Sequence, residues 1–237
     1  MSITGQHNRR LKEIRKLRMR RRWRERSGRF VAEGEDLLAA ADAAGWDAVE
    51  RFCAAGSGLG GVEVEPELLA SASGIASGTR ALAVYEERWA PNATGPLCVY
   101  LHGVHDPGNV GAVVRAAQAF AAASVALGPG CADPFGPKAV RASMGAVFAV
   151  PLATADAIGE LPGVKVALVP GRGVTLRAME TPPEATLIVG SEREGLPENV
   201  IDRADRTAQI PIKTNSLNAA MAATVALYEL ALRMDRP

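Results

Sequence analysis

Three loops in the second half of the chain combine polar side chains with glycine, and each follows an apolar run. The first lies in residues 101–120, LHGVHDPGNVGAVVRAAQAF, where Asp106 and the proline after it suit a turn into a helix. Gly108 and Gly111 allow the backbone to approach a ligand closely. Arg115 is the one charge of the alanine-rich segment that follows, near the helix end where backbone N–H groups also point. This loop is the first candidate ligand site.

A second such loop spans residues 188–197, IVGSEREGLP, and begins where an apolar run ends at Gly190. Glu192 falls inside the loop, which turns at Gly195, and the proline at its end suits the first position of a helix. Taken alone, this pattern is also typical of an ordinary turn from a strand into a helix.

The third stretch is residues 210–230, IPIKTNSLNAAMAATVALYEL. Asn215 or Ser216 can cap the long helix that follows, and the first turn of that helix places Asn218 near the same mouth. Each loop by itself is compatible with plain turn and capping chemistry. Because all three follow strands, their joint occurrence favours one ligand site built from all of them.

Alternating strands and helices must position these loops. Near-continuous apolar strands that alternate with helices predict a parallel sheet covered on both faces. Such sheets bind ligands in loops at the carboxyl ends of their strands. We predict strands at 97–101, 123–127, 147–150, 164–169, 186–190 and 207–212, and helices at 108–121, 134–144, 197–204 and 216–234.

The first part of the chain predicts a smaller, separate α/β unit of about 60 residues. Its expected strands are 29–33, 48–53, 62–65 and 81–87, and its expected helices are 34–45 and 66–73. Residues 88–96, RWAPNATGP, are rich in proline and polar residues, which is typical of a linker between domains.

The composition is that of an ordinary globular chain, with 237 residues, 48% hydrophobic and 22% charged. No run of 18 apolar residues is present, and the basic N-terminus lacks the apolar core of a signal peptide, so we expect no membrane segment. Cys53, Cys98 and Cys131 stand singly, without a metal-ligand spacing. This argues against a disulfide framework or a zinc site and favours the cytoplasm.

Charge is distributed unevenly along the chain. Residues 9–26 hold 11 of the 27 basic residues but 2 of the 26 acidic ones, so they carry +9 and the remainder carries −8. Leu11, Ile14 and Leu17 recur at helical spacing, which predicts an amphipathic helix. A basic segment on an acidic body favours nucleic acid as a partner over a solvated helix face or a membrane surface. The expected RNA-binding side chains are Arg9, Arg10, Lys12, Arg15, Lys16, Arg20 and Arg24.

The chain resembles, in three ordered motifs, the SpoU (TrmH-like) family of RNA ribose 2′-O-methyltransferases in the SPOUT superfamily: DPGNVGAVVRAAQAF, IVGSEREGLP and IPIKTNSLNAAMAATVALYEL. Residues 128–151, GPGCADPFGPKAVRASMGAVFAVP, resemble the family between its first two motifs. The segment RFVAEGEDLL resembles the start of the small RNA-binding domain that many members carry. The three motifs are specific as an ordered set, whereas any one alone is weak.

The resemblance implies an α/β fold whose C-terminal segment threads through a loop, which makes a deep trefoil knot. The expected domains are residues 1–90, a basic helix with a small α/β RNA-binding domain, and residues 96–237, the knotted methyltransferase domain. The resemblance also implies a homodimer without a metal. It places the cofactor, S-adenosylmethionine, at Gly190, Ile210, Leu217 and Asn218.

The implied activity is methyl transfer to a ribose hydroxyl of RNA, with ribosomal RNA favoured over transfer RNA by the appended N-terminal domain. The hydroxyl oxygen must lie in line with the methyl group and needs help in losing its proton. Because a guanidinium stays protonated, we expect Arg115 to hold a phosphate and stabilise the forming alkoxide rather than to act as a base. We expect Asn109 and Asn218 to position the ribose and Glu192 to anchor Arg115 or Asn109. The implied catalytic set is Asn109, Arg115, Glu192, Ser216 and Asn218.

Two features depart from the family pattern. Ala121 and Ala122 stand where members usually have a glycine, and the loop 212–215 is shorter than usual and lacks glycine, which bears on cofactor affinity. His102 and His105 flank a turn and are interpreted as structural. Two rival classes fit less well: the intact catalytic set argues against a non-catalytic RNA-binding relative, and no G-x-G-x-x-G follows a strand as in a Rossmann-type methyltransferase.

Overall fold

The computed structural model describes residues 2–75, 78–214 and 216–234. The fold divides into two compact units, Met1–Arg88 with Asp133–Ala149, and Trp89–Ala132 with Val150–Pro237. The first boundary falls inside the predicted linker. Residues 133–149, which the sequence assigns to the second domain, instead pack into the first unit.

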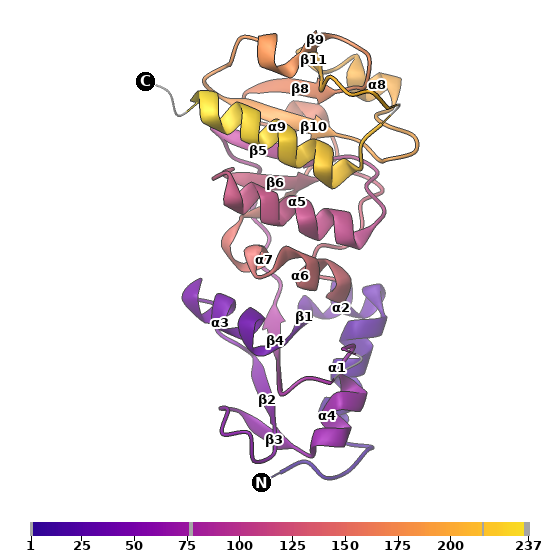
Figure 1. The fold of residues 1–237 in the computed structure, drawn as a ribbon. Helices are drawn as coiled ribbons and strands as arrows, with labels where there is room; N and C mark the ends of the chain where they lie inside the picture. The colour runs from indigo at the N-terminus through magenta and orange to yellow at the C-terminus, as the bar shows by residue number, and fades with distance from the viewer. Residues whose placement is uncertain (1, 76–77, 215, 235–237) are drawn as a thin grey trace. The chain divides into compact units, whose positions relative to one another are not determined.

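The first unit is built on a four-stranded sheet of order β1-β4-β2-β3 (Figure 1). Strands β1 and β2 run antiparallel to β4, and β3 runs parallel to β2. Every strand and helix predicted between residues 29 and 87 is present. The elements are α1 (Arg9–Met19), α2 (Arg21–Ser27), β1 (Arg29–Glu33), α3 (Glu35–Ala43), β2 (Glu50–Ala54), β3 (Val62–Val64), α4 (Pro66–Ala72), β4 (Ala81–Glu86), α6 (Pro137–Ser143) and α7 (Ala146–Ala149).

One face of this sheet is covered by α1. Leu11, Ile14 and Leu17 are fully buried and share an apolar cluster with Val31 and Phe52 of the sheet. The predicted amphipathic pattern is therefore confirmed, and its apolar stripe faces the core.

On its other face, the sheet packs against an aromatic cluster to which residues 133–149 contribute Phe135 and Phe148. The Phe30 and Phe135 ring centroids lie 4.8 Å apart, and Trp46 and Phe148 lie 5.1 Å apart. The indole N–H of Trp46 donates to the backbone carbonyl of Phe148 at 2.8 Å. The strand predicted at 147–150 is wrong, because these residues begin in the helical turn α7. A short apolar run does not by itself distinguish a strand from a buried helix.

Ion pairs also attach this segment to the first unit. Arg24 Nε donates to Asp133 Oδ2 at 2.7 Å, and Arg24 Nη1 donates to the carbonyl of Leu17 at 2.6 Å. Glu33, whose side chain is 1% exposed, is paired with Arg18 at 2.7 Å and with Arg141 at 3.1 Å. Buried charges are tolerated only when paired in this way.

The second unit contains a seven-stranded sheet of order β7-β6-β5-β10-β8-β11-β9, in which each pairing is parallel. The predicted strands at 97–101, 123–127, 164–169, 186–190 and 207–212 all appear with small shifts of their ends. The elements are β5 (Leu97–Leu101), α5 (Pro107–Ala119), β6 (Ser124–Leu127), β7 (Leu152–Thr154), η1 (Ile158–Glu160), β8 (Val164–Leu168), β9 (Val174–Thr175), η2 (Leu176–Ala178), β10 (Ala185–Val189), α8 (Glu198–Ile201), β11 (Arg206–Gln209) and α9 (Ala219–Met234).

Helices α5 and α9 lie side by side and cover one face of this sheet (Figure 1). A second cluster, which includes Tyr100 and Ile188 from the strands, packs with Leu196 and Ile201. Because the strands are parallel, the loops that follow β5, β10 and β11 leave the same edge of the sheet. Within the described ranges, no helix is long and apolar enough to cross a membrane.

Candidate functional site

Helix α5 begins with a side-chain cap. Asp106 Oδ1 accepts hydrogen bonds from the backbone N–H groups of Gly108 at 2.6 Å and Asn109 at 3.1 Å. Pro107 occupies the first helical turn, where its missing N–H costs nothing. The Asp-Pro-Gly-Asn sequence thus starts the helix and fixes Asn109 at its mouth.

The loop after β10 is closed tightly at its base. A Cβ on Gly190 would lie 2.3 Å from the carbonyl oxygen of Gly195, so only glycine fits there. Ser191 Oγ accepts a hydrogen bond from the N–H of Glu194 at 3.2 Å. Gly195 has φ +68°, the left-handed region that glycine favours. These constraints fix the direction in which Glu192 leaves the loop.

Helix α9 begins at Ala219, three residues later than predicted. Its cap is Asn218, whose Oδ1 accepts from the N–H groups of Ala220 at 3.0 Å and Met221 at 3.2 Å. Ser216 lies before the helix as the structure has it, and Asn215 lies outside the described residues. The cap therefore falls on the residue that we expected in the first helical turn.

The three loops join through their side chains. Asn109 Nδ2 donates to Glu192 Oε1, and Asn218 Nδ2 donates to Asn109 Oδ1 at 3.0 Å. Each asparagine is thereby held in one amide orientation. Glu192 anchors Asn109, which is one of the two partners that we expected for it. This partner of Glu192 is a neutral amide rather than a cation.

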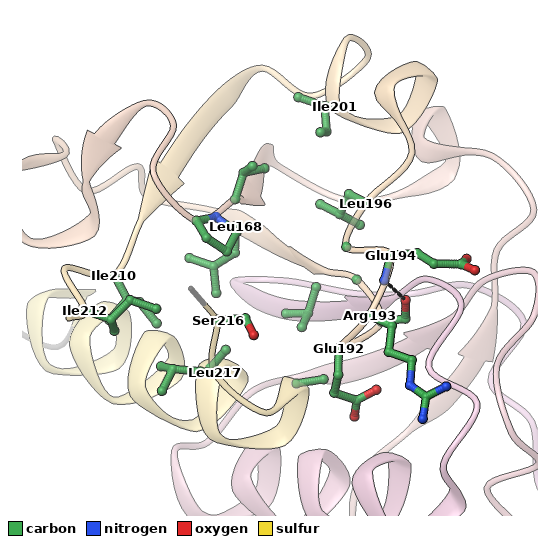
Figure 2. A pocket seen from close by; sticks show the side chains of 18 of the residues that line it. Leu168, Glu192, Arg193, Glu194, Leu196, Ile201, Ile210, Ile212, Ser216 and Leu217 are labelled. Carbon is green, nitrogen blue, oxygen red and sulfur yellow. Dashed lines mark hydrogen bonds between the residues drawn. The ribbon is translucent and has the colours of Figure 1, made fainter. Parts of the chain in front are cut away.

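A cavity of about 370 Å³ opens beside this triad. Gly190, Ile210 and Leu217, which we expected to hold the cofactor, line this cavity, and so do Glu192 and Ser216 (Figure 2). Asn218, also predicted to contact the cofactor, is not among the lining residues. The larger part of the wall is apolar and includes Leu168, Val169, Pro170, Leu196, Ile201 and Ile212.

Sequence reasoning missed part of this wall. Leu168, Val169 and Pro170 lie at the end of β8, the strand next to β10, and in the loop after it. A signal was available, because a loop after a neighbouring parallel strand must reach the same edge of the sheet. This loop lacks the polar residues by which we selected the other three.

Two members of the predicted catalytic set stand apart from the triad. Arg115 is exposed on α5, and among the described residues it makes no hydrogen bond or ion pair. Ser216 is exposed at the cavity, where its backbone carbonyl accepts from Thr214 Oγ1 at 3.3 Å. The structure thus brings together Asn109, Glu192 and Asn218, and leaves Arg115 accessible to a ligand.

The basic segment of the first unit separates into exposed and buried charges. Arg9, Arg10, Lys12, Lys16 and Arg20 are exposed, and Arg15 is partly so. Arg24 is 5% exposed and engaged by Asp133, so its prediction as an RNA contact is wrong. An arginine within a basic run can equally well anchor a distant segment of the fold.

His102 packs against the core of the second unit. Its Nδ1 lies 3.2 Å from the hydroxyl of Tyr100. Burial lowers the pKa of His102, and burial raises the pKa of Tyr100 to about 12. Both groups are therefore neutral near pH 7, which agrees with a structural interpretation of His102.

Comparison with known proteins assigns the family. The model of the SpoU rRNA methylase family matches residues 96–228, which is more than half of the chain. The chain belongs to the SpoU rRNA methylase family. A second model, the MRM3-like substrate binding domain, matches residues 8–89. The SpoU match contains all three loops of the site.

Individual relatives agree with this. The chain is 31% identical over 146 residues to the 23S rRNA (guanosine(2553)-2′-O)-methyltransferase RlmP of Bacillus subtilis, covering 58% of this chain and 59% of that protein. It is 28% identical to an uncharacterized tRNA/rRNA methyltransferase of Synechocystis, covering 96% and 92%. Over several curated relatives the chain spans less than two thirds of their length, from 29% to 59%.

Solved structures extend the likeness to the whole chain. An AdoMet-bound rRNA methyltransferase from Sinorhizobium meliloti is 29% identical, with a TM-score of 0.88 over 100% of this chain and 99% of that one. The α/β fold with its parallel sheet is therefore that of a SpoU methyltransferase.

Proposed function

We propose that this chain is an S-adenosylmethionine-dependent 2′-O-methyltransferase of RNA, and that its substrate is ribosomal RNA. The observation that carries the proposal is the hydrogen-bonded triad of Asn109, Glu192 and Asn218 beside a cavity in a SpoU family fold. The name of the Bacillus subtilis relative specifies 2′-O-methylation of 23S rRNA, and the Sinorhizobium meliloti structure holds AdoMet.

The cavity fits the cofactor in size and lining. Its volume of about 370 Å³ lies within the range of small-molecule sites. The apolar wall suits an adenine ring, and backbone groups at Gly190, Ile210 and Leu217 supply polar contacts. The carboxylate of Glu192 complements a sulfonium cation. When bound, the cofactor supplies an electrophilic methyl group.

The side chains of the triad orient the other reactant. Glu192 fixes the amide of Asn109, and Asn218 holds the same amide from its carbonyl side. These amides position the ribose so that its 2′-oxygen faces the cavity. Arg115, exposed on α5, binds a phosphate and stabilises the negative charge that develops on the 2′-oxygen as its proton passes to solvent water and the oxygen takes the methyl group.

Two measurements test this function. Calorimetric titration with S-adenosylmethionine should show binding, and incubation with unmodified 23S rRNA should yield a 2′-O-methylated nucleoside by mass spectrometry. Arg115→Ala should lower the rate by about 100-fold with cofactor affinity retained, and Arg115→Lys should rescue it poorly, because an ammonium lacks a bidentate grip. Gln118→Ala, exposed on the same helix, should change neither.

Different outcomes point to different corrections. RNA binding without any cofactor binding by the wild type favours a non-catalytic relative. Methylation of transfer RNA but not ribosomal RNA in the same assay moves the substrate to the alternative class. Unchanged turnover in Arg115→Ala contradicts the assignment of Arg115.

A homodimer is proposed on the exposed face of α9. Met221, Val225, Tyr228 and Leu232 are 63%, 43%, 51% and 47% exposed and recur along one side of the helix. Leu227 and Leu230 of the same helix are fully buried in their own chain. A second copy that packs along this stripe would cover it. Light scattering should give about twice the chain mass of 24.8 kDa, and Val225→Glu should shift it to the monomer.

The trefoil knot is proposed from the family and from the path of the chain. After β11, the chain crosses the edge of the sheet where the loop after β10 lies, and Gly190, Ile210 and Leu217 line one cavity there. A cytoplasmic location is proposed from Cys53, Cys98 and Cys131, which are free and buried.

A further inference from the structure

Arg193 stands at the tip of the loop that carries Glu192. The N–H of Gly195 donates to the carbonyl of Ser191 at 3.0 Å, and the Ser191 hydroxyl accepts from Glu194. These bonds close the loop on both sides of Arg193. Its backbone is therefore fixed one residue from Glu192, which itself contacts Asn109.

The guanidinium of Arg193 lacks an internal role. Its side chain is exposed, and within the part of the chain that the structure describes it forms neither a hydrogen bond nor an ion pair. A guanidinium offers five donors in a planar fork, which matches the oxygens of a phosphate or carboxylate. This cation thus has its full hydrogen-bonding capacity available for a ligand.

The charges next to Arg193 oppose a polyanion, so Arg193 is needed to offset them. Glu192 and Glu194 precede and follow it at the rim of the cavity, and two carboxylates repel an approaching RNA backbone. Arg193 is the one cation in the sequence of residues 190–197 and offsets one of these two charges. This positive charge matters most where a phosphate must come close to the triad.

Arg193 itself lines the cavity, but its side chain lies at the end that Glu192 occupies. Figure 2 shows the guanidinium of Arg193 beside Glu192 and directed away from Ile210, Ile212 and Leu217 across the cavity. The group therefore lies at the end of the cavity formed by Glu192, which is a member of the triad.

We propose that Arg193 binds the backbone phosphate adjacent to the target ribose and so positions the RNA rather than the cofactor. The inference rests on the proposed function. In a nucleotide the 2′-hydroxyl neighbours the 3′-phosphate, so a ribose held by Asn109 brings a phosphate next to the Glu192 loop. Arg193 grips this phosphate through two parallel N–H donors.

The test compares Arg193→Gln with Arg203→Gln. Arg203 is also exposed and, within the described residues, also without a side-chain partner, but it precedes β11 at the opposite end of the strands. With unmodified 23S rRNA, Arg193→Gln should raise the KM for RNA about tenfold and leave kcat at saturating RNA unchanged. The salt slope of RNA binding should fall by about 0.7 to 0.9. Arg203→Gln should match the wild type in each.

Calorimetry with S-adenosylmethionine decides whether Arg193 binds an RNA phosphate or the carboxylate of the cofactor. Unchanged cofactor affinity in Arg193→Gln supports the phosphate, whereas a weakened affinity with an unchanged RNA salt slope assigns Arg193 to the cofactor carboxylate and overturns the proposal. Equal KM and equal slope in Arg193→Gln and wild type also overturn it. Because the slope is a binding measurement, it reports on Arg193 even if the chain transfers no methyl group, a result that would count against the proposed function alone.

Discussion

The two units use carboxylates in opposite ways. In the first unit, Glu33 is buried and paired with two arginines, and it also accepts a hydrogen bond from the N–H of Gly74 at 2.8 Å. In the second unit, Glu192 is partly exposed at a cavity and has a neutral amide as its partner. Two arginines offset the charge of Glu33 inside the fold, whereas among the described residues no cation is paired with Glu192. The two carboxylates therefore differ in the number and charge of their partners, which agrees with the structural role of Glu33 and the role that we propose for Glu192.

The largest effect is expected when the buried network is broken. Glu33→Gln leaves Arg18, a largely buried cation, without its counter-charge, so the free energy of unfolding should fall by about 3 to 5 kcal/mol. Urea denaturation followed by circular dichroism measures this. The double variant Glu33→Gln with Arg18→Met should recover part of the loss, and a loss in the single variant below about 1 kcal/mol would contradict a structural role for the pair.

The matching change in the second unit should affect rate rather than stability. Glu192→Gln keeps the size of the side chain but offers Asn109 an amide in place of a carboxylate. We expect single-turnover methyl transfer to fall by about 100-fold, with an unfolding free energy within about 1 kcal/mol of the wild type. A variant that is strongly destabilised but transfers methyl groups at the normal rate would place Glu192 with Glu33 as a structural group.

Cations of the first unit should divide in the same manner. Lys12→Gln combined with Arg20→Gln removes two exposed charges and should lower the salt slope of RNA binding by about 0.7 for each phosphate that is no longer neutralised, without a change in stability. Arg24→Gln should lower the free energy of unfolding and leave the salt slope unchanged, because Arg24 is bound to Asp133. Identical slopes in the double variant and the wild type would mean that Lys12 and Arg20 are solvated and do not contact RNA.

The smallest effect is expected two residues from Glu33. Glu35 forms an exposed ion pair with Arg80 at 3.4 Å, with side chains 47% and 63% exposed. Glu35→Gln should change the unfolding free energy by less than about 1 kcal/mol, since water screens such pairs. The same carboxylate-to-amide change at two nearby positions then isolates burial as the cause of the difference.

The positions of the three loops could be predicted from the sequence because their signals are local. Asp106, Gly190 and Gly195 each occupy a position that a cap or a tight turn requires, and the strand before each loop is readable from its apolar run. Parallel strands then bring the loops to one edge without any further information. Ile210 and Leu217, two of the residues expected to hold the cofactor, line the cavity because their loop leaves the same edge of the sheet.

Long-range pairing explains what local patterns miss. Arg24 resembles its basic neighbours in sequence, and its buried partner Asp133 lies 109 residues away. Phe148 belongs to an apolar run with no strand partner, and its environment is set by Trp46 in another part of the chain. Met19, the last residue of α1, is apolar but 79% exposed, and it lies outside the apolar cluster that contains Leu11, Ile14 and Leu17.

The membership of residues 133–149 in the first unit has a consequence for how the protein is made. The chain leaves that unit after Arg88, re-enters it at Asp133 and leaves again after Ala149. During synthesis on the ribosome, the aromatic cluster of Phe30, Trp46 and Tyr85 cannot form completely until Phe135 and Phe148 have been synthesised. The first unit therefore cannot complete its core as a nascent N-terminal domain, and a gene fusion that exchanged residues 1–88 alone would transfer an incomplete core.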